Sequence, residues 1–203
     1  MKKRTLTILI AVVLVVACAV GGTLAWLTDT SGPVTNTFTA GDVDITLIET
    51  VYPDGTTKAD NSPVTDWSAP MIPGTSYDKN PVVTVTDKTN TGCYLFVKFE
   101  ELNGAATYLD YESTLTAANG WTKGDGTTIP SDVWYRVVPA DAEDTSWHLL
   151  KNDTVTVNAN NVTKENMSTA DDAELVYTAY AVQKDNIETA AEAWAKLPTT
   201  TTP

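Results

Sequence analysis

Histidine and cysteine are nearly absent from this 203-residue chain, which contains one histidine, His148, and two cysteines, Cys18 and Cys93. A zinc hydrolase needs several close protein ligands and a general base, commonly from a His-Glu-x-x-His helix, and that motif does not occur. Cys18 lies in an apolar N-terminal stretch, so a domain exported without it would hold Cys93 alone and form no internal disulfide. We therefore expect no catalytic residues, no metal and no cofactor. We expect burial and sheet pairing to stabilise the domain.

Basic residues are also scarce, because the chain has 13 of them against 26 acidic residues. Lys2, Lys3 and Arg4 are three of the 13, so a chain cleaved after Ala25 keeps 10 basic and all 26 acidic residues, a net charge of −16. Nucleic acid and anionic membrane surfaces would repel such a chain. We expect no nucleic-acid partner, and contact with a membrane only through the N-terminal segment.

That N-terminal segment has the form of an export signal. Lys2, Lys3 and Arg4 give a positive start, and residues 6–20 are apolar apart from Thr7. Thr23-Leu24-Ala25 then places small residues at the positions that a signal peptidase reads. We expect residues 1–25 to be a signal peptide, with cleavage between Ala25 and Trp26 by a signal peptidase. The protein is then secreted, extracellular or held at the cell surface.

Two alternatives for this segment stay open. Val15-Val16-Ala17-Cys18 resembles a lipoprotein box, and an acylated Cys18 would tether the chain to the membrane. Residues 5–28 carry no charge, and about 20 such residues are enough to span a bilayer uncleaved. All three outcomes deliver the remaining chain to the same side of the membrane.

The rest of the sequence predicts many short strands. Val43, Ile45 and Leu47 alternate with polar residues, as in a half-buried strand. Turn residues at 53–55 and 73–74 separate further segments. Strands are predicted at 82–86, 93–100, 133–138 and 174–183, together with a hairpin of 146–150 and 154–157 across the turn at 151–153. The run from 93 is apolar on both faces at first, which predicts a central strand.

One helix is expected near the C-terminus. Asn186 can cap it, and an apolar stripe follows at helical spacing, formed by Ile187, Ala190, Ala191, Trp194 and Leu197. Many strands with one terminal helix predict an all-β fold, an antiparallel jelly-roll-like sandwich with a short C-terminal helix, preceded by an N-terminal signal helix. The expected organisation is a signal peptide at 1–25, an extended segment at 26–38, a sandwich domain at 39–198 and a Thr-rich tail at 199–203.

The signal junction and the first strand resemble the TasA/camelysin family of secreted Gram-positive proteins. The shared features are Gly21-Gly22-Thr23-Leu24-Ala25 before the cut, Trp26-Leu27-Thr28-Asp29 after it, and Asn36-x-Phe38-x-x-Gly41-x-Val43-x-Ile45-x-Leu47. A second similar block runs from Pro73-Gly74 through Asn90-Thr91-Gly92 to the aromatic strand. The ending from Tyr177 to Gln183 with its Ala/Trp helix is also similar. Residues 101–170 carry no motif of the family.

The resemblance implies a jelly-roll subunit of biofilm matrix fibres, in which a subunit donates its N-terminal strand to the next copy. The donor here would be residues 26–38, with Trp26, Leu27, Val34 and Phe38 as candidate subunit contacts. Gly32-Pro33 interrupts this stretch, and proline lacks an N–H for a sheet ladder, so the donor can consist of two short pieces. The alternative is that residues 26–35 are a frayed end and only Asn36 onward pairs within its own sandwich.

Other functions would depend on a few particular residues. Some members of the similar family carry a protease label. In this chain His148 falls in an expected strand and Cys93 alternates with core residues. We expect both residues to be structural. A monomeric adhesin or carbohydrate-binding module would use an aromatic face of Trp67, Trp121, Trp134 and Trp147, which we expect to fill the core or cap its ends. Asp42 and Asp44 could bind calcium, but no calcium-loop motif accompanies them. We therefore expect these two side chains to be solvated at the surface.

Overall fold

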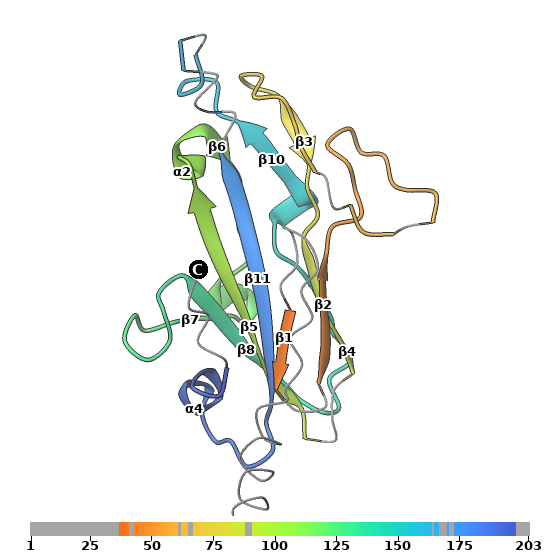
Figure 1. Ribbon diagram of the computed structural model, residues 1–203, viewed down its shortest axis with the longest axis vertical. Coiled ribbons are helices and arrows are strands. Elements are labelled where there is room, and N and C mark those ends of the chain that lie inside the picture. The colour runs from red at the N-terminus through yellow and green to blue at the C-terminus, as the bar shows by residue number, and fades with distance from the viewer. Residues whose placement is uncertain are drawn as a thin grey trace, which may run out of the picture.

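The computed structural model describes residues 37–40, 43–60, 62–64, 67–87, 91–163, 165–166, 170 and 173–197. The predicted signal peptide, the Thr-rich tail and all of the predicted extended segment before Thr37 lie outside these residues. The described chain is all-β (Figure 1). Its strands are β1 Thr37–Ala40, β2 Asp44–Ile48, β3 Ser76–Asp78, β4 Val82–Asp87, β5 Cys93–Leu102, β6 Leu109–Asp110, β7 Thr122–Lys123, β8 Val133–Val138, β9 Ser146–His148, β10 Thr154–Val157 and β11 Glu174–Gln183. Its helical turns are α2 Ala105–Tyr108, η1 Ala117–Asn119, η2 Lys151–Asp153 and α4 Ala190–Trp194.

The largest sheet has five strands in the order β1-β11-β5-β8-β7. β11 and β5 pair antiparallel over their full ten residues, from Glu174 opposite Leu102 to Gln183 opposite Cys93. The first five residues of β5 are all buried, which confirms the predicted central strand. These two strands lie side by side along the long axis of the molecule (Figure 1).

Two three-stranded sheets complete the architecture, in the orders β2-β4-β9 and β3-β10-β6. β2 confirms the predicted alternation, since Ile45 and Leu47 are buried while Asp44 is exposed. The β2-β4-β9 sheet packs its inner face on the five-stranded sheet, in a sandwich-like arrangement. The main core lies between them and includes Leu47, Val83, Val85, Leu95, Val97, Ala179 and Ala181.

A second apolar cluster covers the opposite face of the five-stranded sheet. Phe96, Tyr180 and Val182 pack there against Ala193 of α4, and the Trp194 ring lies 5.2 Å from that of Phe96. The predicted C-terminal helix is therefore present, but it is shorter than expected. Because β5 and β11 carry apolar residues on both faces, they are covered on both sides.

The predicted cap of this helix is wrong. Asn186 has a φ of 56° and lies before the helix. Thr189 caps it instead, accepting from the backbone N–H of Glu192, while the Glu192 side chain accepts from the backbone N–H of Thr189. This reciprocal capping box satisfies two donors that a helix start otherwise leaves unpaired.

The predicted hairpin of residues 146–157 is also wrong. β9 pairs with β4, whereas β10 pairs with β3 and β6, so the two segments belong to different sheets. Asn152 and Asp153 both adopt positive φ angles, 57° and 51°. The chain between the two segments forms the short helical turn η2, and β10 continues into the other sheet.

The five-stranded sheet has one parallel edge strand. β1 pairs with β11 in parallel, from Thr37 opposite Ala179 to Ala40 opposite Val182. β1 spans the predicted boundary between the extended segment and the sandwich, because Thr37 and Phe38 belong to the former. It lies beside the second half of β11 only (Figure 1).

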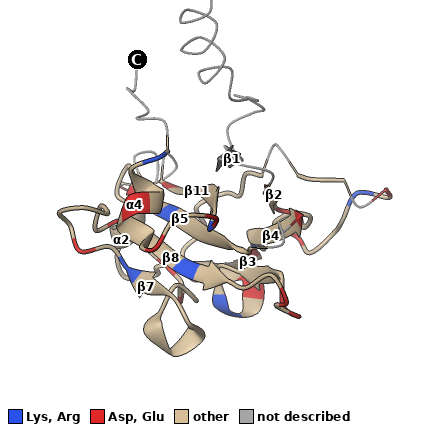
Figure 2. Cartoon of the chain, turned by 90° about the horizontal axis from the view of Figure 1, so that it is seen from below, with Lys and Arg blue, Asp and Glu red and all other residues tan. Residues whose placement is uncertain are grey.

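Charge is spread over the described surface. Acidic residues occupy loops and element ends on several sides (Figure 2). Among the described residues, no helix combines the length and the apolar character required to cross a membrane.

Candidate functional site

The described strands occupy only half of the edge of β11. β1 covers it from Ala179 to Val182, and no described strand pairs with it along residues 174–178. Unpaired N–H and C=O groups on such an edge can accept a further strand. This stretch, called here the open β11 edge, is about five residues long, the length of an ordinary short strand.

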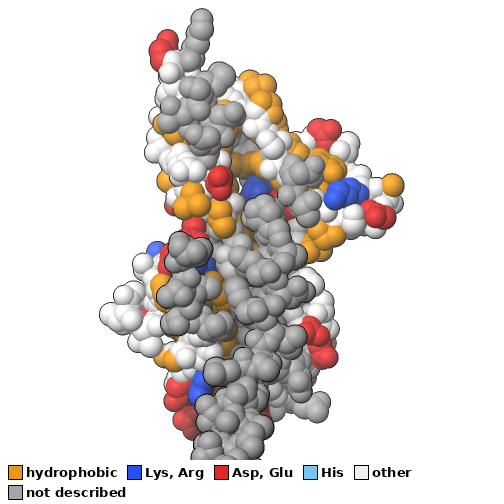
Figure 3. Space-filling view, in the orientation of Figure 1, with side chains coloured by type: hydrophobic (Ala, Val, Ile, Leu, Met, Phe, Trp, Pro, Cys, Tyr) orange, Lys and Arg blue, Asp and Glu red, His pale blue; other side chains and the backbone are white. Residues whose placement is uncertain are grey.

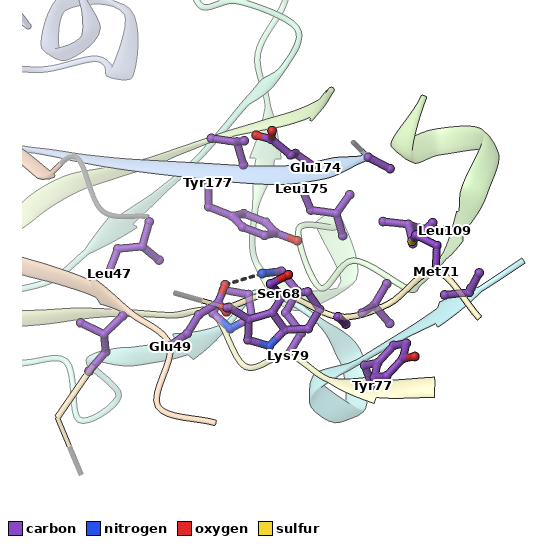
Figure 4. A pocket seen from close by; sticks show the side chains of 18 residues that line it. Leu47, Glu49, Ser68, Met71, Tyr77, Lys79, Leu109, Glu174, Leu175 and Tyr177 are labelled. Carbon is purple, nitrogen blue, oxygen red and sulfur yellow. Dashed lines mark hydrogen bonds and ion pairs between the residues drawn. The ribbon is translucent and has the colours of Figure 1, made fainter. Parts of the chain in front are cut away.

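A pocket of about 380 Å³ lies directly beside the open β11 edge. Residues 174–177 form one wall, the end of β2 forms another, and β3, β10 and the loop around Trp67 close it (Figure 4). Most of the lining is apolar, with side chains from Leu47, Met71, Leu109, Val155, Val157 and Leu175. Hydrophobic side chains are visible on the same face around the upper part of the molecule, where β3 and β10 lie (Figure 3). An apolar cavity with few polar groups is the usual form of a ligand or peptide site.

An ion pair lies inside this apolar pocket. Glu49 directly follows β2 and Lys79 directly follows β3, and Lys79 Nζ donates to Glu49 Oε1 at 2.7 Å. Their side chains are only 3% and 9% exposed. Asn80 holds the two segments in place, since its side-chain oxygen accepts from the backbone N–H groups of Thr50 and Val51. The pair is therefore built into the wall of the pocket.

Two polar atoms of the pocket lack a hydrogen-bond partner in the described structure. Glu49 Oε2 and the Tyr177 hydroxyl are both buried and unpaired. Tyr177, on β11, points across the cavity toward the segments that carry Glu49 and Lys79 (Figure 4). Burial, with smaller effects of nearby Tyr111 and Glu49, raises the pKa of the Tyr177 hydroxyl well above its ordinary value. The hydroxyl therefore stays neutral and can donate or accept.

Trp67 is part of the pocket wall and makes two contacts there. Its indole N–H donates to the backbone carbonyl of Asp78 at 2.9 Å. Lys79 Nζ lies 4.4 Å from the centre of its ring, within cation–π range. The pocket thus offers an aromatic surface, a neutral ion pair and two unused polar atoms.

The candidate subunit contacts fall only partly within the structure. Phe38 is in β1, opposite Tyr180 of the same chain. Ala25, Trp26, Leu27 and Val34 lie outside the described residues, as do Cys18 and Asp42. The pairing of β1 with its own chain agrees with the alternative in which residues from Asn36 onward belong to their own sandwich.

Cys93 and His148 are separated in the fold. Cys93 is fully buried in β5, and burial raises the pKa of its thiol to about 11. His148 is in β9 of a different sheet, is 56% exposed and places Nδ1 2.8 Å from Asp153 Oδ1. A thiol so placed is protonated at neutral pH and is a poor nucleophile. Cys93 is a buried core residue and His148 lies in a strand, as predicted.

Most of the tryptophans do not form an exposed platform. Trp121 is 2% exposed in the main core, with Trp134 and Trp147 packed against that core. The Arg136 guanidinium lies 4.3 Å from the ring centre of Trp147 and 5.2 Å from that of Trp121. The rings of Trp121 and Trp147 therefore lie against a partly buried cation. Asp44 is exposed, and no group of three or more His, Cys, Asp or Glu side chains able to hold a metal occurs in the described part of the chain.

The pocket residues Glu49, Lys79 and Tyr177 were not identified from the sequence. One signal was present, because Glu49 continues the buried positions Val43, Ile45 and Leu47 at period two. A carboxylate at a position patterned for burial needs a partner, and that partner is 30 residues away in sequence. Lys79 and Tyr177 carry no local signal of this kind.

Comparison with known proteins finds no protein-family model, no curated protein and no solved structure that matches this chain.

Proposed function

We propose that this protein is a secreted structural subunit of extracellular matrix fibres, and that each copy donates its N-terminal segment to the open β11 edge of the next copy. The observation that carries this proposal is the half-occupied edge with an apolar pocket beside it. In β-augmentation, main-chain hydrogen bonds provide affinity and side-chain pockets provide specificity. Both parts of such a site are present here.

The segment directly before β1 in the same chain is a poor occupant of this edge. Continuing the register of β1 backwards would set Thr35 opposite Tyr177 and Pro33 opposite Leu175. Tyr177 and Leu175 face the inner side, so this continuation would offer the apolar pocket a threonine and a proline. Proline also has no N–H for the ladder. Residues 26–30, which include Trp26 and Leu27, match the length and the chemistry of the edge better.

In this proposal the extended segment works as two pieces. Residues 37–40 pair with their own β11, residues 26–30 pair with the β11 of a neighbour, and Gly32-Pro33 separates the two. Such a contact is head-to-tail and does not close on itself, so it propagates as a filament. Export would start it, because cleavage after Ala25 frees the donor outside the cell. The resemblance to the TasA/camelysin family supports the same role, the jelly-roll connectivity and the location.

Electron microscopy of the chain that begins at Trp26 tests this function. We expect fibres from this protein, and monomers from a variant that lacks residues 26–35 but keeps β1. A matched control lacks residues 199–203, which removes chain from the other end, and should still form fibres. If the complete chain stays monomeric at high concentration, the fibre function is wrong and a monomeric surface module becomes the better explanation.

A further inference from the structure

We propose that the pocket beside the open β11 edge is a receptor for one side chain, the indole of Trp26 from a second copy, with its N–H donating to Glu49 Oε2. This inference rests on the proposed strand donation and names the residue that is recognised. It starts from Glu49, which lines the cavity and whose Oε2 has no hydrogen-bond partner among the described residues. Oε2 has almost no accessible surface, so the carboxylate turns toward the cavity when it accepts the incoming donor. A buried acceptor without a partner destabilises the subunit alone, so an incoming donor would gain that interaction.

The charge of the Glu49–Lys79 pair favours a neutral hydrogen-bond donor. The Glu49–Lys79 pair is already neutral and almost fully buried. An ammonium or guanidinium entering the pocket would add an uncompensated buried charge, which is costly. A neutral N–H satisfies Oε2 without that cost. Indole is a neutral group that only donates, so it fits an orphaned carboxylate oxygen better than a charged amine does.

The side chains that line the cavity favour an aromatic ring. The cavity is about 380 Å³ and is lined mainly by apolar side chains, together with the face of Trp67. An aromatic side chain buries roughly 150–250 Å² and carries its polar atom at one end, a shape that suits an apolar pocket with polar groups on one wall. Tyr177 supplies a second polar atom from the opposite wall.

The donor segment offers one residue of this chemistry. Between residues 26 and 36, Trp26 is the only aromatic residue, and no other apolar side chain there has a hydrogen-bond donor. Side chains alternate along a strand, so with Trp26 directed into the pocket, Leu27 lies on the other face of the sheet, the face of Val176. Val176 is only partly buried and can be covered there.

The test uses two variants of the chain that begins at Trp26, each blocked at one end. Trp26→Ala keeps the pocket but loses the proposed anchor. Ala173→Trp keeps the anchor but fills the pocket, because Ala173 lines it. Ser68→Trp, at an exposed lining position, is a second blocked pocket in case Ala173→Trp alters folding, which thermal unfolding would detect.

We expect each variant alone to be monomeric and their mixture to form a dimer that grows no further, as measured by light scattering after size exclusion. The change Trp26→Phe in the pocket-blocked copy keeps a ring but removes the N–H. This change should weaken the dimer about tenfold, as for loss of a hydrogen bond to a charged group. With Glu49→Leu and Lys79→Met together in the acceptor copy, which removes the acceptor without leaving a buried charge, the same change should cost less than about threefold, because the indole N–H and Glu49 are coupled.

The outcomes separate this inference from the function on which it rests. If Trp26→Ala still forms fibres, or if the Trp26→Phe donor binds as well as the donor that keeps Trp26, the indole site is wrong and strand donation stands. If the unmodified chain forms fibres but the mixed variants do not dimerise, the pocket is not the receptor. If the unmodified chain forms no fibres and no mixture dimerises, both proposals are wrong. A monomer whose Trp26 fills its own pocket would give this last result.

Discussion

Lys79 Nζ donates to Oε1 of Glu49 at 2.7 Å, while Oε2 of the same carboxylate has no partner in the described structure. A buried ion pair rarely stabilises a fold more than apolar residues of the same volume would, since both ions lose their hydration. Its presence at the wall of an apolar pocket therefore suggests a role in recognition. The pocket adjoins the one stretch of β11 that the described chain leaves open.

Removing one partner of this pair should be strongly destabilising. Lys79→Met leaves the Glu49 carboxylate buried without compensation, and we expect the free energy of unfolding to fall by about 3–5 kcal/mol. The double variant Glu49→Leu, Lys79→Met removes both charges and should recover most of that loss. Urea unfolding of the chain that begins at Trp26 measures both values. A double variant no more stable than Lys79→Met would contradict the ion-pair account.

Removing the unpaired Tyr177 hydroxyl should be nearly harmless. Tyr177→Phe deletes a buried group that has no partner in the described structure, so we expect a change in unfolding free energy within about 0.5 kcal/mol of zero, or a small gain. Tyr111→Phe is the matched control, because the Tyr111 hydroxyl donates to Glu101, and it should cost about 1 kcal/mol. Equal losses for both variants would mean that Tyr177 has a partner after all.

Cys93 should be unreactive in the native protein. With the pKa of its thiol raised to about 11, roughly one molecule in a thousand carries the thiolate at pH 8, and the side chain is fully buried. We expect a thiol-specific reagent to modify it only after unfolding in guanidinium. Rapid modification under native conditions would show that β5 is not central.

The same thiol should make stability depend on alkaline pH. The unfolded thiol ionises near pH 9 and the folded one near 11, so its contribution is complete below pH 9 and is lost as pH rises toward 11. The shift corresponds to roughly 2–3 kcal/mol. The difference in unfolding free energy between the unmodified chain and Cys93→Ala should therefore shrink over this interval. A difference that is constant with pH would contradict the burial-driven shift.

The helix cap can be tested apart from the pocket. Thr189→Ala removes the side-chain acceptor of the capping box and should cost about 1 kcal/mol. Asn186→Gly, at the position predicted from sequence to cap the helix, removes that side chain, tolerates the φ of 56° and removes no cap of α4. Thermal unfolding of the two variants compares them directly. A larger loss at 186 than at 189 would restore the sequence-based assignment.

Local pattern was enough to predict the long strands and their burial. The alternation around Ile45 predicts β2, and apolar residues on both faces predict the central place of β5. Those signals depend on the spacing of apolar residues and on the composition of segments of about ten residues. The all-β fold follows from them.

Features that depend on distant contacts were missed. The hairpin error arose because β9 and β10 pair with strands that are distant in sequence, β4 and β3, and the residues of the turn do not identify those partners. No periodic pattern in the sequence indicates that β1 pairs with β11 in parallel. The pocket combines Glu49, Lys79 and Tyr177 from three separated segments, so only the fold brings them together.

Disulfide cross-linking between two copies tests strand donation most directly. One copy of the chain that begins at Trp26 carries Leu27→Cys, the other carries Val176→Cys, and both carry Cys93→Ala so that no other cysteine remains. A control replaces Val176→Cys by Val137→Cys, on β8 beyond β5 and 43% exposed. We predict an intermolecular 27–176 disulfide, identified by mass spectrometry, at a yield well above the 27–137 control. Equal yields, or no 27–176 product from protein that forms fibres, would contradict donation to the open β11 edge.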